Sequence, residues 1–217
     1  MKAFIENNML VVGWVSFSLS GNIDLMNTDV SELPDDLTIK GWLDLSGSKV
    51  TKLPSGLKVK EWLDITNTGI TLLPERLSVG SLYACDTGVA NIPDDFKVGG
   101  ECDLRGTQIT ELPSNTTISG SLFLDGSAIT ELPKSLHVVG DFNLRNTKIT
   151  QLPDELMVGG WLNLTDTDIK ILPNKMTVNG DLFLAGTAIS VIPSDASVGG
   201  RVDMGDDDLD DNSSLSM

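Results

Sequence analysis

Apolar and polar positions along the chain recur with a period of about 20 residues, and prolines mark that period. Successive prolines are 20 residues apart, except for one interval of 19. The prolines are Pro34, Pro54, Pro74, Pro93, Pro113, Pro133, Pro153, Pro173 and Pro193. A fixed period of this size is typical of a solenoid, in which each repeat forms one coil that stacks on the next.

Each repeat contains a short strand with two inward apolar residues, two positions apart. Such pairs include Leu43/Leu45, Leu122/Leu124 and Leu182/Leu184. Because side chains alternate along a strand, both members of a pair face the core and their neighbours face outward. The Leu-Pro pair then brings the chain back to the core. Proline removes a backbone donor and holds the preceding residue extended, so the outer side of each coil is predicted to be extended or a tight turn.

The position after each strand is occupied only by Asn, Gly or Asp, which tolerate positive φ best. These residues are Asn27, Gly47, Asn67, Asp86, Gly106, Gly126, Asn146, Asp166, Gly186 and Asp206. The sequence therefore predicts a left-handed turn there. A Thr or Ser follows, whose hydroxyl is expected to satisfy backbone groups and to form an internal ladder from coil to coil.

A glycine precedes nearly every strand, with Glu61 as the exception. This recurrence predicts either positive φ or a close approach of two backbones. The interval of 19 residues indicates that one residue is missing between Val79 and Leu82.

The pattern L-x-L-x-x-(N/T)-x-(L/I)-x-x-L-P resembles the leucine-rich repeat in its short bacterial form, and it extends from Gly21 to Asp208. The resemblance implies a repeat solenoid with a curved parallel β-sheet on its concave face and an extended or tight-turn convex side with few or no helices. Thr or Ser stands where the secreted effectors of this class carry Asn, and V-x-G replaces their L-x-x-L step, as in repeats of bacterial and phage proteins. A parallel β-helix is the alternative, disfavoured because each repeat shows one clear strand.

Three segments are predicted: an N-terminal cap over 1–20, a single solenoid of about ten coils over 21–205, and an acidic, flexible tail over 206–217. In the cap, alternation predicts a hairpin of Met9–Val12 with the following strand through Gly13. The acidic run of the tail lacks the ligand spacing of a calcium loop, which favours a solvated tail.

The formal net charge is −16, from 15 Lys and Arg against 31 Asp and Glu. That balance argues against binding to nucleic acid or to an anionic membrane, because both require clustered cations. Two cysteines make no disulfide framework. A secretory signal is not expected, because Glu6, Asn7 and Asn8 precede the short apolar run where a signal peptide would be basic. A cytoplasmic location is expected, in a bacterium or in the host cell of a secreted effector.

Aromatic and acidic residues concentrate at the outward positions of the predicted concave face. They include three of the four tryptophans and the only tyrosine. The candidate partner-binding residues are Trp42, Asp44, Trp62, Asp64, Tyr83, Asp103, Arg105, Phe123, Arg145, Trp161 and Phe183. Exposed aromatics dominate binding hot spots, and the two arginines form a basic island. The alternative is that the rings stack along the sheet and stabilise it.

Catalytic chemistry is sparse in this sequence. His137, the only histidine, has no serine or cysteine at a spacing typical of catalysis. Cys102 occupies a core position, and no cation is predicted beside Cys85. Asp24, Asp44 and Asp64 lie in register on neighbouring strands, which leaves an acid–base pair or a hard-cation site open. Without a deep pocket, the sequence predicts no enzyme and no cofactor, and it assigns no residue as a metal ligand.

The sequence therefore predicts a non-enzymatic protein–protein recognition module whose partner presents a basic and apolar surface. The oligomeric state is left open, with a monomer favoured. If the chain is of bacterial or phage origin, it is expected to be an effector that acts on a host protein. The first alternative is an acidic nucleic-acid mimic that inhibits a DNA- or RNA-binding protein. The second is a structural, self-assembling repeat protein. A charge mimic loses affinity steeply as salt rises, which separates it from an aromatic recognition surface.

Overall fold

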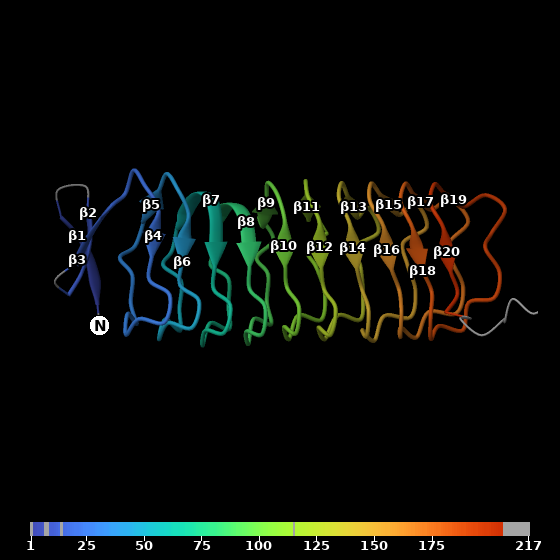
Figure 1. Cartoon of the computed structure of the whole chain (residues 1–217), viewed down its shortest axis with the longest axis horizontal. Helices are drawn as coiled ribbons and strands as arrows, with labels where there is room; N and C mark the ends of the chain where they lie inside the picture. The colour runs from blue at the N-terminus through green and yellow to red at the C-terminus, as the bar shows by residue number, and fades with distance from the viewer. Residues whose placement is uncertain (1, 7–8, 14, 115, 206–217) are drawn as a thin grey trace, which may run out of the picture.

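Stacked coils follow one another along the long axis of the molecule, in the order of the sequence (Figure 1). The computed structural model describes residues 2–6, 9–13, 15–114 and 116–205. Within these residues there are twenty strands and no helix. The described part of the chain accordingly has no helix long and apolar enough to cross a membrane. This architecture confirms the predicted leucine-rich-repeat-like solenoid. The acidic tail predicted over 206–217 lies outside the described residues.

A small antiparallel sheet precedes the coils. Its strands are β1 (Ala3–Glu6), β2 (Met9–Val12) and β3 (Val15–Ser18), in the order β1-β2-β3. The β2–β3 hairpin was predicted, whereas β1 was not. Leu10 is fully buried, and the backbone N–H of Ala3 donates to the carbonyl of Glu32 over 3.0 Å, which ties the sheet to the first coil.

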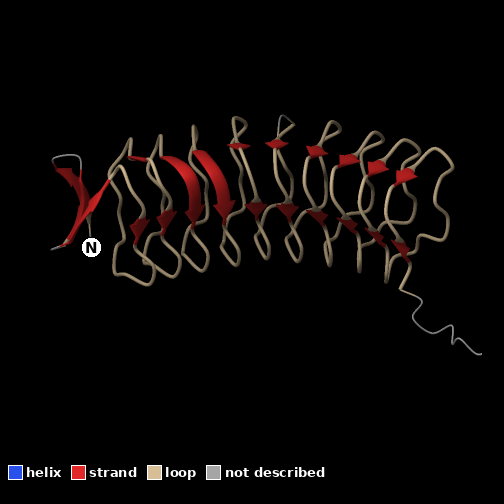
Figure 2. Ribbon diagram, turned by 45° about the horizontal axis from the view of Figure 1, so that its top comes forward, coloured by secondary structure: helices blue, strands red, loops and turns tan. Residues whose placement is uncertain are grey.

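Two rows of parallel strands run the length of the solenoid, and the coils follow a gentle arc (Figure 2). The first row contains β4 (Ile23–Asp24), β6 (Leu43–Asp44), the second halves of β7 (Lys58–Asp64) and β8 (Ser78–Tyr83), β10 (Cys102–Asp103), β12 (Leu122–Phe123), β14 (Phe142–Asn143), β16 (Leu162–Asn163), β18 (Leu182–Phe183) and β20 (Val202–Asp203). The second row contains β5 (Thr38–Ile39), the first halves of β7 and β8, β9 (Lys97–Val98), β11 (Thr117–Ile118), β13 (His137–Val138), β15 (Met157–Val158), β17 (Thr177–Val178) and β19 (Ser197–Val198).

The second row corrects the expectation of one strand per coil. Its strands pair in parallel, as Met157 with Thr177 and Val158 with Val178. Outside β7 and β8, each contributes two residues, one of which faces the core. Alternation over two residues is too short to separate a strand from a turn in the sequence. The coil thus shares a second strand row with parallel β-helices, while its Leu-Pro side remains extended chain and turns.

The repeat of 19 residues lacks one residue in the segment that connects its second-row strand to its first-row strand. Val59 pairs with Val79, and Trp62 pairs with Ser81, so β7 has two intervening residues where β8 has only Gly80. The predicted deletion between Val79 and Leu82 is confirmed. Both rows stay in register because the bulge in β7 absorbs the difference.

All nine described turn positions adopt the predicted left-handed conformation, with φ between 53° and 71°. The tenth, Asp206, lies outside the described residues. The hydroxyl ladder is corrected: the hydroxyl of Thr107 donates to the carbonyl of Leu104, 2.6 Å away in the same coil. Adjacent coils are joined instead by backbone bonds, such as Gly106 N–H to the carbonyl of Asp125 at 3.1 Å.

Most of the glycines that precede the strands are required by close backbone approach rather than by positive φ, whereas a Cβ on Gly21 of the first coil would meet only ordinary contact at 3.9 Å. A Cβ atom on Gly120 would lie 2.6 Å from the carbonyl carbon of Gly100 in the preceding coil. Real Cβ atoms do not approach backbone so closely. Gly99, one column earlier, differs because its Cβ would meet only ordinary contact at 3.6 Å.

Inward residues form one continuous core through the stack. Leu182 and Leu184 of β18 and its turn are 0% and 1% exposed. The equivalent residues of the last described coil, Val202 and Met204, are 39% and 37% exposed. The described solenoid therefore ends with core positions open to solvent.

The glycine column makes a stability prediction. Gly120→Ala is expected to lower the free energy of unfolding by about 2 kcal/mol, because the new methyl group forces neighbouring coils apart. Gly99→Ala, the matched control, is expected to change it by less than about 1 kcal/mol. Urea denaturation followed by circular dichroism measures both. Equal effects would show that close approach at Gly120 does not limit coil packing.

Candidate functional site

Three aromatic side chains gather on the outward side of the first row at β6, β7 and β8. This outward side, predicted as the concave face, is called here the first-row face. The rings of Trp42 and Trp62 stack with centroids 4.6 Å apart and planes 7° apart. Tyr83 meets Trp62 edge-on, with centroids 6.2 Å apart. All three side chains are half-buried. They form the N-terminal aromatic cluster.

A second group lies further along the same face, at β12, at the residue that precedes β16, and at β18. Trp161 meets Phe123 and Phe183, each with a centroid distance of 6.2 Å. These residues form the C-terminal aromatic cluster, and they too are half-buried. The six predicted aromatic residues therefore form two clusters rather than one strip. Ring packing between strands is present, as the stacking alternative anticipated, and part of every ring stays exposed.

Equivalent positions of successive coils form columns along the face. The central column, which contains Asp24, Asp44, Asp64 and their equivalents, has a structural role that sequence analysis missed. Asp64 Oδ1 accepts a hydrogen bond of 2.8 Å from the backbone N–H of Thr66, where the strand ends. The same bond, from residue i+2 to the side chain, recurs at Asp24, Asp44, Asp103, Asn143, Asn163 and Asp203. Such Asx turns satisfy a donor that the turn leaves unpaired. Recurrent Asp or Asn before a left-handed turn was the available signal.

The neighbouring column of short polar residues joins one coil to the next. Asp141 Oδ1 accepts from Trp161 N–H at 3.0 Å, and Asp181 Oδ1 accepts from Arg201 N–H at 2.8 Å. Ser81 Oγ accepts from the N–H of Glu101 in the same way. Carboxylates in this column hold backbone donors of the following coil, so their position alone does not indicate a binding role.

Asp103 and Arg105 form a tight ion pair at the middle of the face. Asp103 was expected to face outward, but it is only 4% exposed. Arg105 covers it, with Nη2 2.6 Å from Oδ2 and Nε 2.9 Å from Oδ1. The hydrogen bond to Asp103 raises the pKa of the Arg105 guanidinium. A buried carboxylate requires such a bidentate partner.

The predicted basic island is electrically balanced, which corrects its expected character. Arg105 is neutralised by Asp103, and Arg145 Nε lies 3.6 Å from Asp166 Oδ2. Asp125 lies between the two arginines, lining a shallow hollow with Arg145 and Asp166. Burial raises the pKa of Asp125. The centre of the face therefore presents paired charges rather than free cations.

Asp24, Asp44 and Asp64 differ from these paired groups. They lie directly opposite one another on β4, β6 and β7, at a strand spacing of about 4.8 Å. None of the three forms an ion pair with any described residue. Three unpaired carboxylates thus flank the N-terminal aromatic cluster.

Candidate nucleophiles and metal ligands are dispersed among the described residues. No three His, Cys, Asp or Glu side chains there are arranged to hold a metal ion. Burial, helped by Asp86, raises the pKa of the Cys85 thiol to about 11, so it stays protonated at neutral pH. Cys102 is fully buried in β10. His137 lies in β13 of the second row, away from the first-row face.

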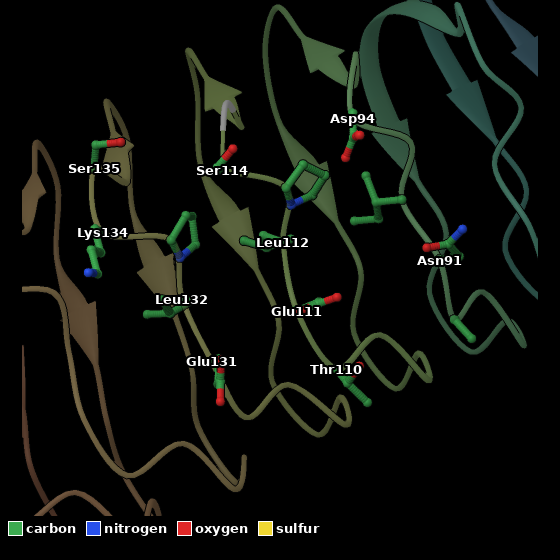
Figure 3. Close-up of a pocket in the computed structure, with 14 residues that line it drawn as sticks. Asn91, Asp94, Thr110, Glu111, Leu112, Ser114, Glu131, Leu132, Lys134 and Ser135 are labelled. Atoms are coloured by element: carbon green, nitrogen blue, oxygen red, sulfur yellow. The ribbon is translucent and has the colours of Figure 1, made fainter.

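A broad hollow lies elsewhere, on the Leu-Pro side of the coils (Figure 3). It has a volume of about 690 Å³ and is open and shallow. Pro113 and Pro133 line it together with Leu112, Glu111 and Glu131. None of the predicted site residues contributes to it. Its position follows from the repeated Leu-Pro step.

Comparison with known proteins gives limited similarity. No protein-family profile matches the chain, and no curated protein sequence matches it. Among solved structures, YopM from Yersinia enterocolitica WA-314 is similar, with 17% identity and a TM-score of 0.40. The match covers 83% of this chain and 51% of the YopM chain, so this chain spans about half the length of that protein. The assignment of the fold rests on the repeat and on the coil geometry described above.

The Asx turns predict which substitutions at Asp64 the fold tolerates. Asp64→Asn keeps the Oδ1 acceptor and is expected to change the free energy of unfolding by less than about 0.5 kcal/mol. Asp64→Ala leaves the N–H of Thr66 without its partner and is expected to cost about 1 kcal/mol. Urea denaturation compares the two. If Asn costs as much as Ala, the negative charge rather than the acceptor stabilises the turn.

The phenol of Tyr83, the only tyrosine, titrates within the N-terminal aromatic cluster and reports on its environment. Burial, followed by the charges of Glu101, Asp103 and Asp64, raises the pKa of its phenol above the ordinary value of 10.0. Tyrosinate absorbance is expected to show this raised midpoint, and Glu101→Gln is expected to lower it. The folded chain holds this proton more tightly, so the contribution to stability is present below about pH 10 and is lost as pH rises through the folded pKa. A midpoint at 10 or below would contradict the described environment.

Proposed function

We propose that this protein is a non-enzymatic recognition module that binds a protein partner through its first-row face. One observation carries the proposal: the half-exposed N-terminal aromatic cluster lies beside the unpaired carboxylates Asp24, Asp44 and Asp64. Together these groups complement a partner surface with apolar and basic side chains.

The fold does not require aromatic side chains at the positions of the two clusters. Asn, Asp and Ser occupy equivalent positions in other coils, where they accept backbone hydrogen bonds. Tyr83, Phe123 and Phe183 give up the Asx bond that Asp or Asn makes in the central column. Large rings at outward positions cost solubility unless a partner covers them. Rigid, pre-packed rings also lose little side-chain entropy on binding, which suits a recognition surface.

The proposal of a binding role over catalysis has chemical support. The thiol of Cys85 is held in its protonated form, and the described hollows are shallow. Leucine-rich-repeat-like solenoids typically serve as non-enzymatic scaffolds. The described residues bring together no nucleophile, base and deep pocket of the kind that catalysis uses.

The resemblance to short bacterial and phage repeats supports a more specific proposal. In it, the protein is a bacterial or phage effector that acts in the cytoplasm, either its own or that of a host cell. The partner is then a host protein with a basic and apolar surface. Monomeric protein suffices for this role, because one chain contributes the whole first-row face.

Affinity capture with identification by mass spectrometry tests the proposal. The bait is the full chain, compared with Trp42→Ala/Trp62→Ala/Trp161→Ala, in lysates at low and high salt. The matched control is Leu72→Ala/Ile171→Ala/Val191→Ala, because these side chains are 58%, 79% and 72% exposed on the Leu-Pro side. Circular dichroism verifies that each bait is folded.

We expect one protein to be retained at high salt by the wild type and the control, and lost by the tryptophan variant. Purified binary affinity should then fall by about 10-fold or more. Capture that survives the tryptophan substitutions but disappears with salt would overturn the proposal in favour of an acidic nucleic-acid mimic. Capture of the chain itself would favour a self-assembling structural protein.

A further inference from the structure

The first-row face is asymmetric along its length, and we propose that its N-terminal half is a subsite for arginine and lysine side chains. This basic-residue subsite consists of Asp24, Asp44 and Asp64 together with Trp42 and Trp62. The inference rests on the proposed function and adds an orientation to it. The basic segment of the partner lies over β4 to β8, and its apolar segment lies over β12 to β18 (Figure 1).

The fold does not require negative charge at these three positions. Asn143 and Asn163 make the same Asx bond, at 3.1 and 2.9 Å, that Asp24, Asp44 and Asp64 make. The bond uses one acceptor oxygen, which an amide supplies as well as a carboxylate. Three consecutive coils nevertheless carry the acid. A charge that the turn does not need is available for a ligand.

The rest of the face carries mixed charge. Asp103 is buried under Arg105. From β10 onward, Arg105, Arg145 and Arg201 occupy outward first-row positions among the acidic residues of the face. No lysine or arginine occupies an outward first-row position from β4 to β8, where Asp24, Asp44 and Asp64 are the acidic residues. The N-terminal end of this face therefore carries negative charge with no cation among its outward first-row positions.

The arrangement of Trp42 and Trp62 at this end suits a cation–π contact with a basic side chain. Trp62 covers one ring face of Trp42, in parallel stacking at 4.6 Å. On the β4 side the equivalent residue is Asn22, whose Oδ1 accepts from Trp42 N–H at 3.3 Å, and no described ring contacts Trp42 there. A guanidinium or ammonium group above this ring face gains cation–π attraction. Asp24 and Asp44 occupy neighbouring outward positions of the same two coils, and a carboxylate there can accept charge-assisted hydrogen bonds from the remaining donors of the cation.

Screening makes this local charge more important than the net charge. Unpaired charges act over about 8 Å at physiological ionic strength. Spaced about 4.8 Å apart, the three carboxylates reinforce one another within that range. A cationic side chain at the subsite therefore experiences all three, whereas it is screened from the acids on the far sides of the coils.

Octa-arginine and octa-lysine peptides test the subsite directly, with isothermal titration calorimetry on the full chain. The test variant is Asp24→Asn/Asp44→Asn/Asp64→Asn, which keeps every Asx acceptor. The control variant is Glu111→Gln/Glu131→Gln/Asp168→Asn, which removes the same net charge at exposed positions away from the first-row face. Tryptophan indole N–H signals in nuclear magnetic resonance spectra, assigned by Trp→Phe variants, report where each peptide binds.

We expect the test variant to weaken octa-arginine binding by about 10-fold, since three ion pairs are lost, and the control to weaken it by less than about 3-fold. The indole signals of Trp42 and Trp62 should shift, and that of Trp161 should not. Equal weakening by both variants, or equal shifts at all three indoles, would overturn the subsite. Absence of binding by the wild type would overturn it as well.

The two proposals fail differently. Tryptophan-dependent capture of a protein, combined with diffuse peptide binding, would remove the subsite but keep the recognition face. Localised peptide binding, combined with capture that ignores the tryptophan substitutions, would keep the subsite and remove the recognition face.

Discussion

Backbone hydrogen bonds between residues one repeat apart hold each coil to the next, and every other feature of the fold accommodates them. Neighbouring backbones must approach to strand spacing in both rows, which leaves no room for a Cβ at Gly120 and its equivalents. The turn between the first row and the Leu-Pro side must be equally compact, so it adopts positive φ at Asn, Asp or Gly. Leucines and valines then fill a core whose width the backbone has already set.

Polar residues on the first-row face serve the same backbone. Side-chain oxygens at the strand ends accept the N–H groups that the two-residue strands leave over, either within a coil, as at Asp64, or across coils, as at Asp141. An acidic face therefore does not by itself indicate a binding site. Asp24, Asp44 and Asp64 differ from the other acids of the face because they follow one another on consecutive coils, and because no lysine or arginine occupies an outward first-row position from β4 to β8.

Much of the fold was predictable because the same residue types recur at the same positions in about ten repeats. Positive φ at nine turns, the deletion in β8 and the inward pairs all follow from residue types that recur at fixed positions. The second strand row was missed, because a single inward residue such as Val158 carries no alternation. The pairing of Arg105 with Asp103 was also missed. Sequence places both residues on one face but does not say which side chain folds over the other.

For the site, the sequence located the six aromatic residues, but it did not divide them into two clusters. The division depends on ring orientation: Trp161 reaches across β14 to Phe123, whereas Tyr83 turns its edge to Trp62. Such choices are made by local packing, which outward-facing positions in a repeat leave free.

Because all coils have nearly the same height, the distance between the two aromatic clusters is set by the number of coils between them. Inserting or deleting one complete repeat between Tyr83 and Phe123 would move the two aromatic clusters apart or together by one strand spacing, about 4.8 Å, and would leave the interior of each unchanged. Evolution by duplication of single repeats would thus tune the separation of two contact points in fixed increments, without redesigning either. Related proteins would then differ first in the distance between the two contact points, and only later in the residues that form them.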